Sequence, residues 1–266
     1  MTKATVWLLW ALPWCILRAQ SPDTLSCTTA LPVQARWAAV NVLDQVCVIR
    51  PDNAIEKYTL EGQLLARYSD NRSGKALSLD VSNPLKVLVW YADFRIVTFL
   101  DRSFTPLGSL NLIQAGFPET RTVALSRDGH LWLYDEVRFR LVKLDMEGNL
   151  LYESQPLNQM IGGAVNIACI REYDGRVWAS DPALGWLEFD VYGQFQRVLS
   201  ATGVIRFEVQ GDYLIWLDQG QLWKRYVRNF TAESRVLPSQ NGVLFASVCA
   251  RWLLFAEENR IKLYRL

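Results

Sequence analysis

Residues 177–195 read Val-Trp-Ala-Ser-Asp-Pro-Ala-Leu-Gly-Trp-Leu-Glu-Phe-Asp-Val-Tyr-Gly-Gln-Phe: an apolar run, an acidic residue, a second apolar run and a turn. Trp178 lies three residues before Asp181, and Gly193 follows the apolar anchor Trp186 by seven residues. The same order of features recurs along the chain in five more places. A unit that repeats six times indicates a repeat fold.

The six units share an acidic residue and, beyond it, an apolar anchor. The acids are Asp52, Asp93, Asp135, Asp181, Asp218 and Glu257, and the anchors are Ile55, Ile96, Leu141, Trp186, Leu222 and Ile261. A residue suited to a tight turn follows the anchor by seven positions in five units, namely Gly62, Ser103, Gly148, Gly193 and Asn229. Gly and Asn tolerate a positive φ, so this position predicts a hairpin turn, with Ser103 as the poorest fit. A further apolar run precedes each acid-bearing strand, so one unit predicts four short strands.

The anchors are 41, 45, 45, 36 and 39 residues apart. Four-stranded units of about 40 to 45 residues are typical of β-propeller blades. The segments Asn259–Tyr264, Phe94–Phe99 and Leu187–Phe195 resemble the repeats of NHL-type six-bladed propellers. This resemblance covers about residues 37–266; it implies a fold but not a function, because propellers host binding proteins, receptors and enzymes.

We therefore expect an all-β, six-bladed β-propeller of four-stranded blades occupying residues 20–266. The expected blades span about 37–74, 75–116, 117–162, 163–203, 204–242 and 243–266. The last unit stops five residues after its anchor and lacks a fourth strand. Residues 24–36 are expected to supply that strand, which closes the ring and covers two exposed sheet edges.

Residues 1–19 have the organisation of a secretory signal peptide. Lys3 precedes an apolar run from Ala4 to Leu17, and Ala19 ends the segment. The run is too short for a comfortable membrane span. Two alternatives stay open, an uncleaved signal anchor and, less well supported because Cys15 lies inside the apolar run, a lipoprotein. The C-terminal end of this segment, where cleavage is expected, resembles that of exported Bacteroidota-type proteins. This resemblance implies a periplasmic or cell-surface location. No second transmembrane span is expected in the mature chain.

Charge and histidine content narrow the function. The formal net charge is +1, or −1 after removal of Lys3 and Arg18, so the electrostatic basis for binding nucleic acid is missing. The chain has a single histidine, His130, placed at a turn after Asp128-Gly129. This excludes His-rich metal sites and leaves little material for His-dependent catalysis. No phosphate-binding Gly-rich loop, nucleophile elbow or metal-spaced Cys/His cluster occurs.

Four cysteines follow the signal segment: Cys27, Cys47, Cys169 and Cys249. Their even number permits disulfides in an oxidising compartment. The last three lie inside apolar strand-like runs, so buried free thiols are the favoured interpretation.

The recurrent residues are expected to serve the blades. An acid in every unit is best explained by hydrogen bonds to backbone N–H groups at a turn. The tryptophans of the second strands are expected to pack between blades: Trp90, Trp132, Trp178, Trp216 and Trp252. Trp37, Trp186 and Trp223 are less regular, and one of them, if exposed, would be a candidate partner contact.

Function is expected where the blades differ, in the polar residues of the first strands around the central channel. Gluconolactonase-like propellers bind a divalent cation at such a place through Glu, Asn and Asp oxygens. Asn41, Asp80, Asn166 and Glu208 have the right chemistry for a hard cation, but no matching motif surrounds them. They are low-ranking metal candidates, and no cofactor and no catalytic residue is assigned.

Two functions remain in competition. The favoured one is an exported, non-enzymatic propeller that acts as a rigid binding or scaffold module for a protein or cell-envelope component. A fixed subunit of a larger assembly is a further alternative. The alternative is a metal-dependent hydrolase or lactonase with a cation site in the axial channel. Stoichiometric metal bound by channel residues would distinguish the second from the first.

Overall fold

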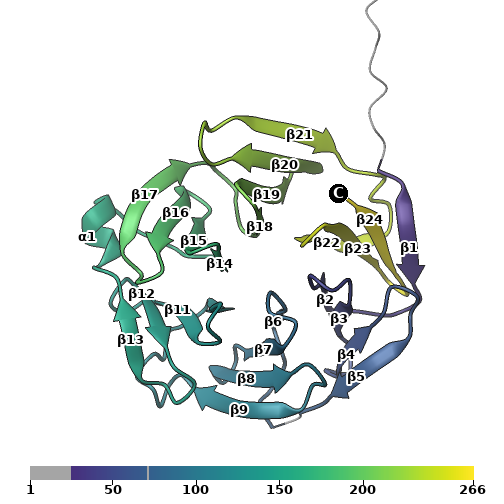
Figure 1. The fold of residues 1–266 in the computed structure, drawn as a ribbon, viewed down its shortest axis with the longest axis horizontal. Coiled ribbons are helices and arrows are strands. Elements are labelled where there is room, and N and C mark those ends of the chain that lie inside the picture. The colour runs from purple at the N-terminus through teal and green to yellow at the C-terminus, as the bar shows by residue number, and fades with distance from the viewer. Residues whose placement is uncertain (1–24, 71) are drawn as a thin grey trace, which may run out of the picture.

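The computed structural model describes residues 25–70 and 72–266. Six sheets, each of four antiparallel strands, stand side by side in a closed ring around a central axis (Figure 1). The fold is a six-bladed β-propeller, which confirms the class expected from the repeat. The proposed signal segment, residues 1–19, lies outside the described residues.

The strands follow one another outward from the axis in each blade. Blade 1 contains β2 (Trp37–Val40), β3 (Val46–Ile49), β4 (Ile55–Tyr58) and β5 (Leu64–Tyr68). Blade 2 contains β6 (Ser78–Asp80), β7 (Lys86–Tyr91), β8 (Ile96–Asp101) and β9 (Pro106–Asn111). Blade 3 contains β10 (Val123–Leu125), β11 (Leu131–Asp135), β12 (Arg140–Leu144) and β13 (Leu150–Glu153).

The second half of the ring has the same order. Blade 4 contains β14 (Cys169–Tyr173), β15 (Arg176–Asp181), β16 (Gly185–Asp190) and β17 (Phe195–Ser200). Blade 5 contains β18 (Phe207–Gln210), β19 (Tyr213–Asp218), β20 (Gln221–Tyr226) and β21 (Ala232–Val236). Blade 6 contains β22 (Val243–Cys249), β23 (Trp252–Glu257), β24 (Ile261–Arg265) and β1 (Cys27–Leu31).

The N-terminal strand β1 completes blade 6, as expected. It pairs antiparallel with β24, with Cys27 opposite Tyr264 and Leu31 opposite Ile261. Leu31 is 1% exposed and belongs to a buried cluster that includes residues of blades 6, 1 and 2. The first and last described strands thus close the ring through backbone pairing and apolar packing together.

The core of the molecule lies between the blades. The five tryptophans expected there are buried; Trp90, for example, packs in a cluster with Leu131 and Leu133 of the next blade. The middle strands are buried on both faces, as β3 and β11 show, whereas the outer strand β13 is exposed at every position. Burial of apolar surface at about 25 cal/mol per Å² makes these seams the main source of stability.

Three of the six recurrent acids, Asp52, Asp135 and Asp181, serve turns in the expected way, whereas Glu257 pairs with Arg260 and Lys262. Asp135 Oδ1 accepts hydrogen bonds from the backbone N–H groups of Val137 and Arg138, and Asp181 Oδ1 accepts them from Ala183 and Leu184. The carboxylates thereby satisfy backbone donors between the second and third strands of their blades.

The positive-φ residue of the hairpin turn differs from the expectation in two blades. Gly62, Gly148 and Gly193 have positive φ, but in blades 2 and 5 the residue is Phe104 (φ 63°) or Phe230 (φ 63°), one position after Ser103 and Asn229. A non-glycine residue in this region needs compensation. Phe104 has it, because its ring is buried and Lys57 Nζ lies 4.8 Å from its centroid.

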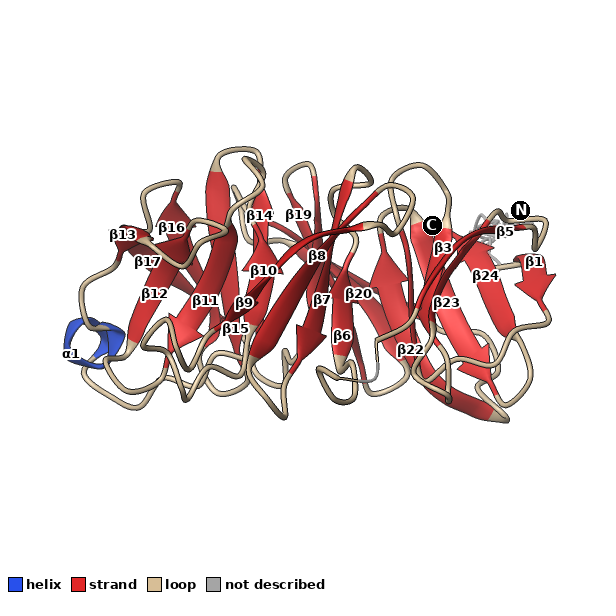
Figure 2. Cartoon of the chain, turned by 90° about the horizontal axis from the view of Figure 1, so that it is seen from below, coloured by secondary structure: helices blue, strands red, loops and turns tan. Residues whose placement is uncertain are grey.

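One short helix interrupts the all-β pattern. The helix α1 (Leu157–Ile161) lies in the connection from blade 3 to blade 4, on the outer side of the ring (Figure 2). No helix of the described part of the chain is long and apolar enough to cross a membrane.

The ring has two faces, which we name from the inner strands β2, β6, β10, β14, β18 and β22. The start face is the one at which these strands begin, and the end face is the one at which they end. Because neighbouring strands are antiparallel, the turns between second and third strands also lie on the start face.

Candidate functional site

A cavity of about 980 Å³ runs along the propeller axis, and residues of all six inner strands contribute to its wall. Its size is at the upper end of the range for small-molecule sites, roughly 300 to 1,000 Å³. The blade repeat makes the cavity, but the side chains that line it differ from blade to blade.

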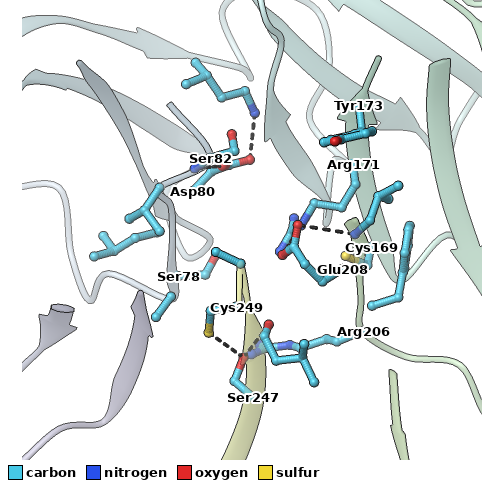
Figure 3. A pocket seen from close by; sticks show the side chains of 18 of the residues that line it. Ser78, Asp80, Ser82, Cys169, Arg171, Tyr173, Arg206, Glu208, Ser247 and Cys249 are labelled. Carbon is cyan, nitrogen blue, oxygen red and sulfur yellow. Dashed lines mark hydrogen bonds and ion pairs between the residues drawn. The ribbon is translucent and has the colours of Figure 1, made fainter. Parts of the chain in front are cut away.

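Alternation along the inner strands decides which side chains reach the cavity. Figure 3 shows residues two apart lining it together: Ser78, Asp80 and Ser82; Cys169, Arg171 and Tyr173; Arg206 and Glu208; Ser247 and Cys249. This is the period of two that a pleated strand imposes.

Three of the four residues proposed from the sequence as cation ligands line this cavity, namely Asn41, Asp80 and Glu208. Asn41 is 2% exposed, and its Oδ1 accepts hydrogen bonds from the backbone N–H groups of Leu43 (2.9 Å) and Gln45 (3.0 Å). Its Nδ2 donates to Gln45 Oε1 at 3.0 Å. The Asn41 side chain therefore shapes the turn between β2 and β3.

Asp80 links two blades. Its Oδ1 accepts a hydrogen bond from Ser82 N at 3.0 Å within blade 2, and its Oδ2 accepts one from Leu125 N at 3.0 Å in blade 3. Asp80 is buried at 6% exposure. Both oxygens already satisfy backbone donors, a role that a carboxylate performs without a metal.

Glu208 faces Arg171 across the boundary between blades 4 and 5. Arg171 Nε lies 3.7 Å from Glu208 Oε2, and the two side chains are 28% and 23% exposed. Burial raises the pKa of the Glu208 carboxyl, and the Arg171 charge opposes that rise. Arg171 Nη1 also donates to its neighbour Ile170 O at 2.9 Å, which fixes the guanidinium against the wall.

The fourth candidate, Asn166, lies apart from the other three. It precedes β14 in the connecting segment, its side chain is exposed, and it is absent from the cavity wall. Its backbone N–H donates to Asp181 Oδ2 at 2.6 Å. Within residues 25–70 and 72–266, no three His, Cys, Asp or Glu side chains gather in a way that could hold a metal ion.

Two charged wall residues, Arg171 and Glu172, were not anticipated from the sequence. They lie on the inner strand β14, which extends beyond the apolar residues Cys169 and Ile170 to Tyr173. Glu172 Oε2 accepts hydrogen bonds from Trp132 Nε1 at 2.6 Å and from the Ser126 hydroxyl, so it ties blade 4 to blade 3. The turn Asp174-Gly175, which ends the strand, was the signal that could have placed both residues.

The four cysteines of the described residues are free thiols, and three of them are buried. Cys47, Cys169 and Cys249 are buried and Cys27 is exposed. Burial raises the pKa of Cys47 to about 12 and that of Cys249 to about 11. Thiols with such high pKa values stay protonated at neutral pH and are therefore poor nucleophiles.

His130 does not contribute to the cavity wall. It follows the turn Asp128-Gly129 and its backbone N–H donates to Asp128 Oδ1 at 3.3 Å. Of the three irregular tryptophans, Trp186 is buried, while Trp37 and Trp223 are half-buried.

Comparisons with known proteins support the fold. Virginiamycin B lyase from Staphylococcus aureus, solved as a catalytically inactive histidine-to-alanine variant with quinupristin, superposes with a TM-score of 0.61 at 11% identity, covering 92% of this chain and 98% of that one. BamB from Moraxella catarrhalis superposes with a TM-score of 0.51 at 10% identity, covering 86% and 82%. The propeller domain of Cps50 (Swd1) from Myceliophteria thermophila gives 0.60 at 11%, covering 91% and 99%.

These similarities concern architecture. At such identities they show a shared propeller fold and leave function open. No family model matches the sequence, and no curated protein matches it.

Proposed function

We propose that this chain is an exported, non-enzymatic β-propeller that binds a protein component of the cell envelope through its start face. The ring supplies a rigid scaffold, and the turns supply the contact surface. BamB, the Cps50 propeller domain and virginiamycin B lyase all share this fold. Because one of these three proteins is an enzyme, the choice between binding and catalysis rests on this chain's own residues.

The observation that carries the proposal is a set of exposed, large apolar side chains on the start face. Three lie at the beginning of inner strands and three in turns between second and third strands: Leu77, Ile205 and Leu244, and Phe94, Val137 and Phe139. Ile205 is 61% exposed and Leu244 is 66% exposed. These side chains are spread over blades 2, 3, 5 and 6, and exposed apolar residues on a rigid ring are candidates for contact with a protein.

The composition of the cavity wall favours binding over a cation-dependent hydrolase. Asn41 and Asp80 are engaged by backbone groups, Glu208 faces Arg171, and Asn166 lies elsewhere. A divalent cation needs several oxygen ligands that converge on one point. Assembling them here would require Asp80 to release the blade contact to Leu125 N.

Export is supported by the sequence of residues 1–19 alone. The segment has the charged start, apolar run and small-residue exit of a signal peptide. A near-neutral mature chain also fits a partner recognised by apolar contact rather than by long-range charge.

The test compares two faces of the same ring. Leu77→Asp with Ile205→Asp alters the start face, and Val42→Asp with Leu43→Asp is the matched change on the end face, where both residues are exposed. The protein is purified from native envelopes after mild cross-linking, and co-purifying proteins are quantified by mass spectrometry. We expect a stoichiometric partner that the start-face variant loses and the end-face variant retains.

Three results would contradict the proposal. The first is loss of the partner from the end-face variant alone, and the second is the absence of any stoichiometric protein. The third is metal analysis showing one Ca²⁺ or Zn²⁺ per chain that Asp80→Asn abolishes, which would support the hydrolase alternative.

A further inference from the structure

The axial cavity has a marked imbalance between hydrogen-bond acceptors and donors. Its acidic side chains are largely engaged: Asp80 accepts from two backbone amides, and Glu172 accepts from Trp132 Nε1 and Ser126. Glu208 is paired with Arg171. Asp174, exposed in the turn after β14, is the acidic wall residue whose side chain forms no hydrogen bond or ion pair with a described residue.

Donors of the same wall are unsatisfied. Trp90 Nε1 and Gln210 Nε2 are buried, and neither has a hydrogen-bond partner among residues 25–70 and 72–266. Both residues line the cavity, and Trp90 is 1% exposed. A buried N–H group without an acceptor is costly, so an orphaned donor in a cavity wall indicates that an acceptor belongs there.

Positive charge is unpaired as well. Arg206 and Arg127 line the cavity and make no ion pair or side-chain hydrogen bond with any described residue, whereas Arg121 pairs with Glu136 and Arg251 with Asp44. Arg206 precedes β18 on the start face, and Figure 3 shows its side chain extending into the cavity toward Ser247. Arg171, in the middle of β14, and Arg206, immediately before β18, come from neighbouring blades.

The remaining wall is partly aromatic. Trp37, Trp90, Phe207 and Trp216 line the cavity beside these donors. Guanidinium groups bind carboxylates in a planar, bidentate manner, and aromatic walls accept an apolar ligand body.

We propose that the axial cavity binds an organic carboxylate with an apolar body, its carboxylate held by Arg206 and Arg171 near the start face. Trp90 Nε1 belongs to blade 2, whereas Arg206 and Arg171 belong to blades 5 and 4, so it is a donor to a second acceptor of the ligand rather than to the same carboxylate. Leu77 and Ile205 of the apolar start-face surface also line this cavity, and the two proposals are tested by different variants and different ligands.

The experiment measures binding by isothermal titration calorimetry with benzoate and phenylacetate as probes. Benzamide and phenylacetamide are the uncharged counterparts, and inorganic phosphate tests whether any anion suffices. We expect saturable 1:1 binding of at least one carboxylate, with binding of its amide weaker by about tenfold or more, because charge-assisted hydrogen bonds are lost.

Variants test the assigned residues. Arg206→Gln is expected to weaken carboxylate binding about tenfold. Arg102→Gln is the matched control, because Arg102 is exposed in the turn between β8 and β9 and lies outside the cavity wall. Arg206 is exposed, so its replacement is not expected to impair folding, which circular dichroism checks.

The proposal is overturned if no carboxylate binds to the wild-type protein, if the amides bind equally well, or if only phosphate binds. It is also overturned if Arg206→Gln binds the probe as tightly as the wild type and the control Arg102→Gln do. Loss of protein binding in the start-face variants bears on the other proposal alone.

Discussion

At the residue scale, Asp80 shows how a polar group that faces a cavity can be structural. One carboxylate satisfies two backbone N–H groups, one in its own blade and one in the next. Its position in the wall of the channel made it a reasonable ligand candidate, but its partners place it in the seam between blades 2 and 3.

Replacement of Asp80 by Ala is expected to lower the free energy of unfolding by roughly 2 to 4 kcal/mol, because Ser82 N and Leu125 N both lose their acceptor. Asp80→Asn retains one acceptor oxygen and is expected to cost less. Urea denaturation measures both. Glu258→Ala, at an exposed residue, is the control and is expected to change stability by less than about 0.5 kcal/mol. A cost for Asp80→Ala no larger than the control's would contradict the bridging role.

Cys47 predicts a dependence of stability on alkaline pH. Its side chain is fully buried, and burial raises its pKa to about 12, compared with about 8.5 for an exposed thiol. The unfolded chain therefore loses this proton first as the pH rises. The stabilisation is complete below about pH 8.5 and is lost progressively toward pH 12.

The free energy of unfolding should accordingly fall between pH 8 and pH 10, and Cys47→Ala should flatten that fall. The slope against pH is the readout, since the lost side-chain volume lowers stability equally at every pH. Cys249, with a pKa raised to about 11, contributes in the same direction, so the double variant should be flatter still. An unchanged slope in the double variant would exclude these thiols as the cause.

At the element scale, the features that were predictable from sequence are local ones. Anchors such as Trp186 and acids such as Asp181 recur because every blade needs the same hairpin, so strand number and blade order follow from the repeat. The N-terminal closing strand was predictable because blade 6 visibly lacked its fourth strand.

The features that were not predictable depend on where strands end and on contacts between blades. Arg171 and Glu172 lie on β14 only because that strand continues to Tyr173, and Asn166 lies outside it. The partners of Asp80 and Glu172 belong to other blades, 45 and 40 residues away in sequence for Leu125 and Trp132. A periodic pattern within one blade carries no information about such pairings.

The strand β1 gives a prediction about the closure. Leu31→Ala removes a fully buried side chain from the seam between blades 6 and 1 and is expected to cost about 2 to 5 kcal/mol. Thr28→Ala, at an exposed position of the same strand, is the matched control. Thermal denaturation should show the difference as a loss of roughly 5 to 15 °C in Tm. Equal Tm values for the two variants would show that β1 does not hold the ring closed.

At the scale of the whole molecule, closure means that blade 6 packs against blade 1, so that every blade has two neighbours. In an open row, each blade contacts only its neighbours and the two end blades are the least protected. Here the cluster around Leu31 includes residues of blades 6, 1 and 2, so the first and last strands of the described residues share one buried core.

A closed ring is expected to unfold in one cooperative transition, and a ring weakened at its closure is expected to open there first. Hydrogen exchange followed by mass spectrometry tests this with Leu31→Asp, which places a charge in the buried seam. Protection should fall first in β1, β24, β2 and β3, which flank the closure, while β15 and β16 of blade 4, across the ring, serve as the internal reference (Figure 1). The wild-type protein should instead lose protection in all six blades together. Simultaneous loss of protection in blade 4 and at the seam of the variant would mean that the ring does not open at its closure, because the blades would then be coupled too strongly for any one seam to open alone.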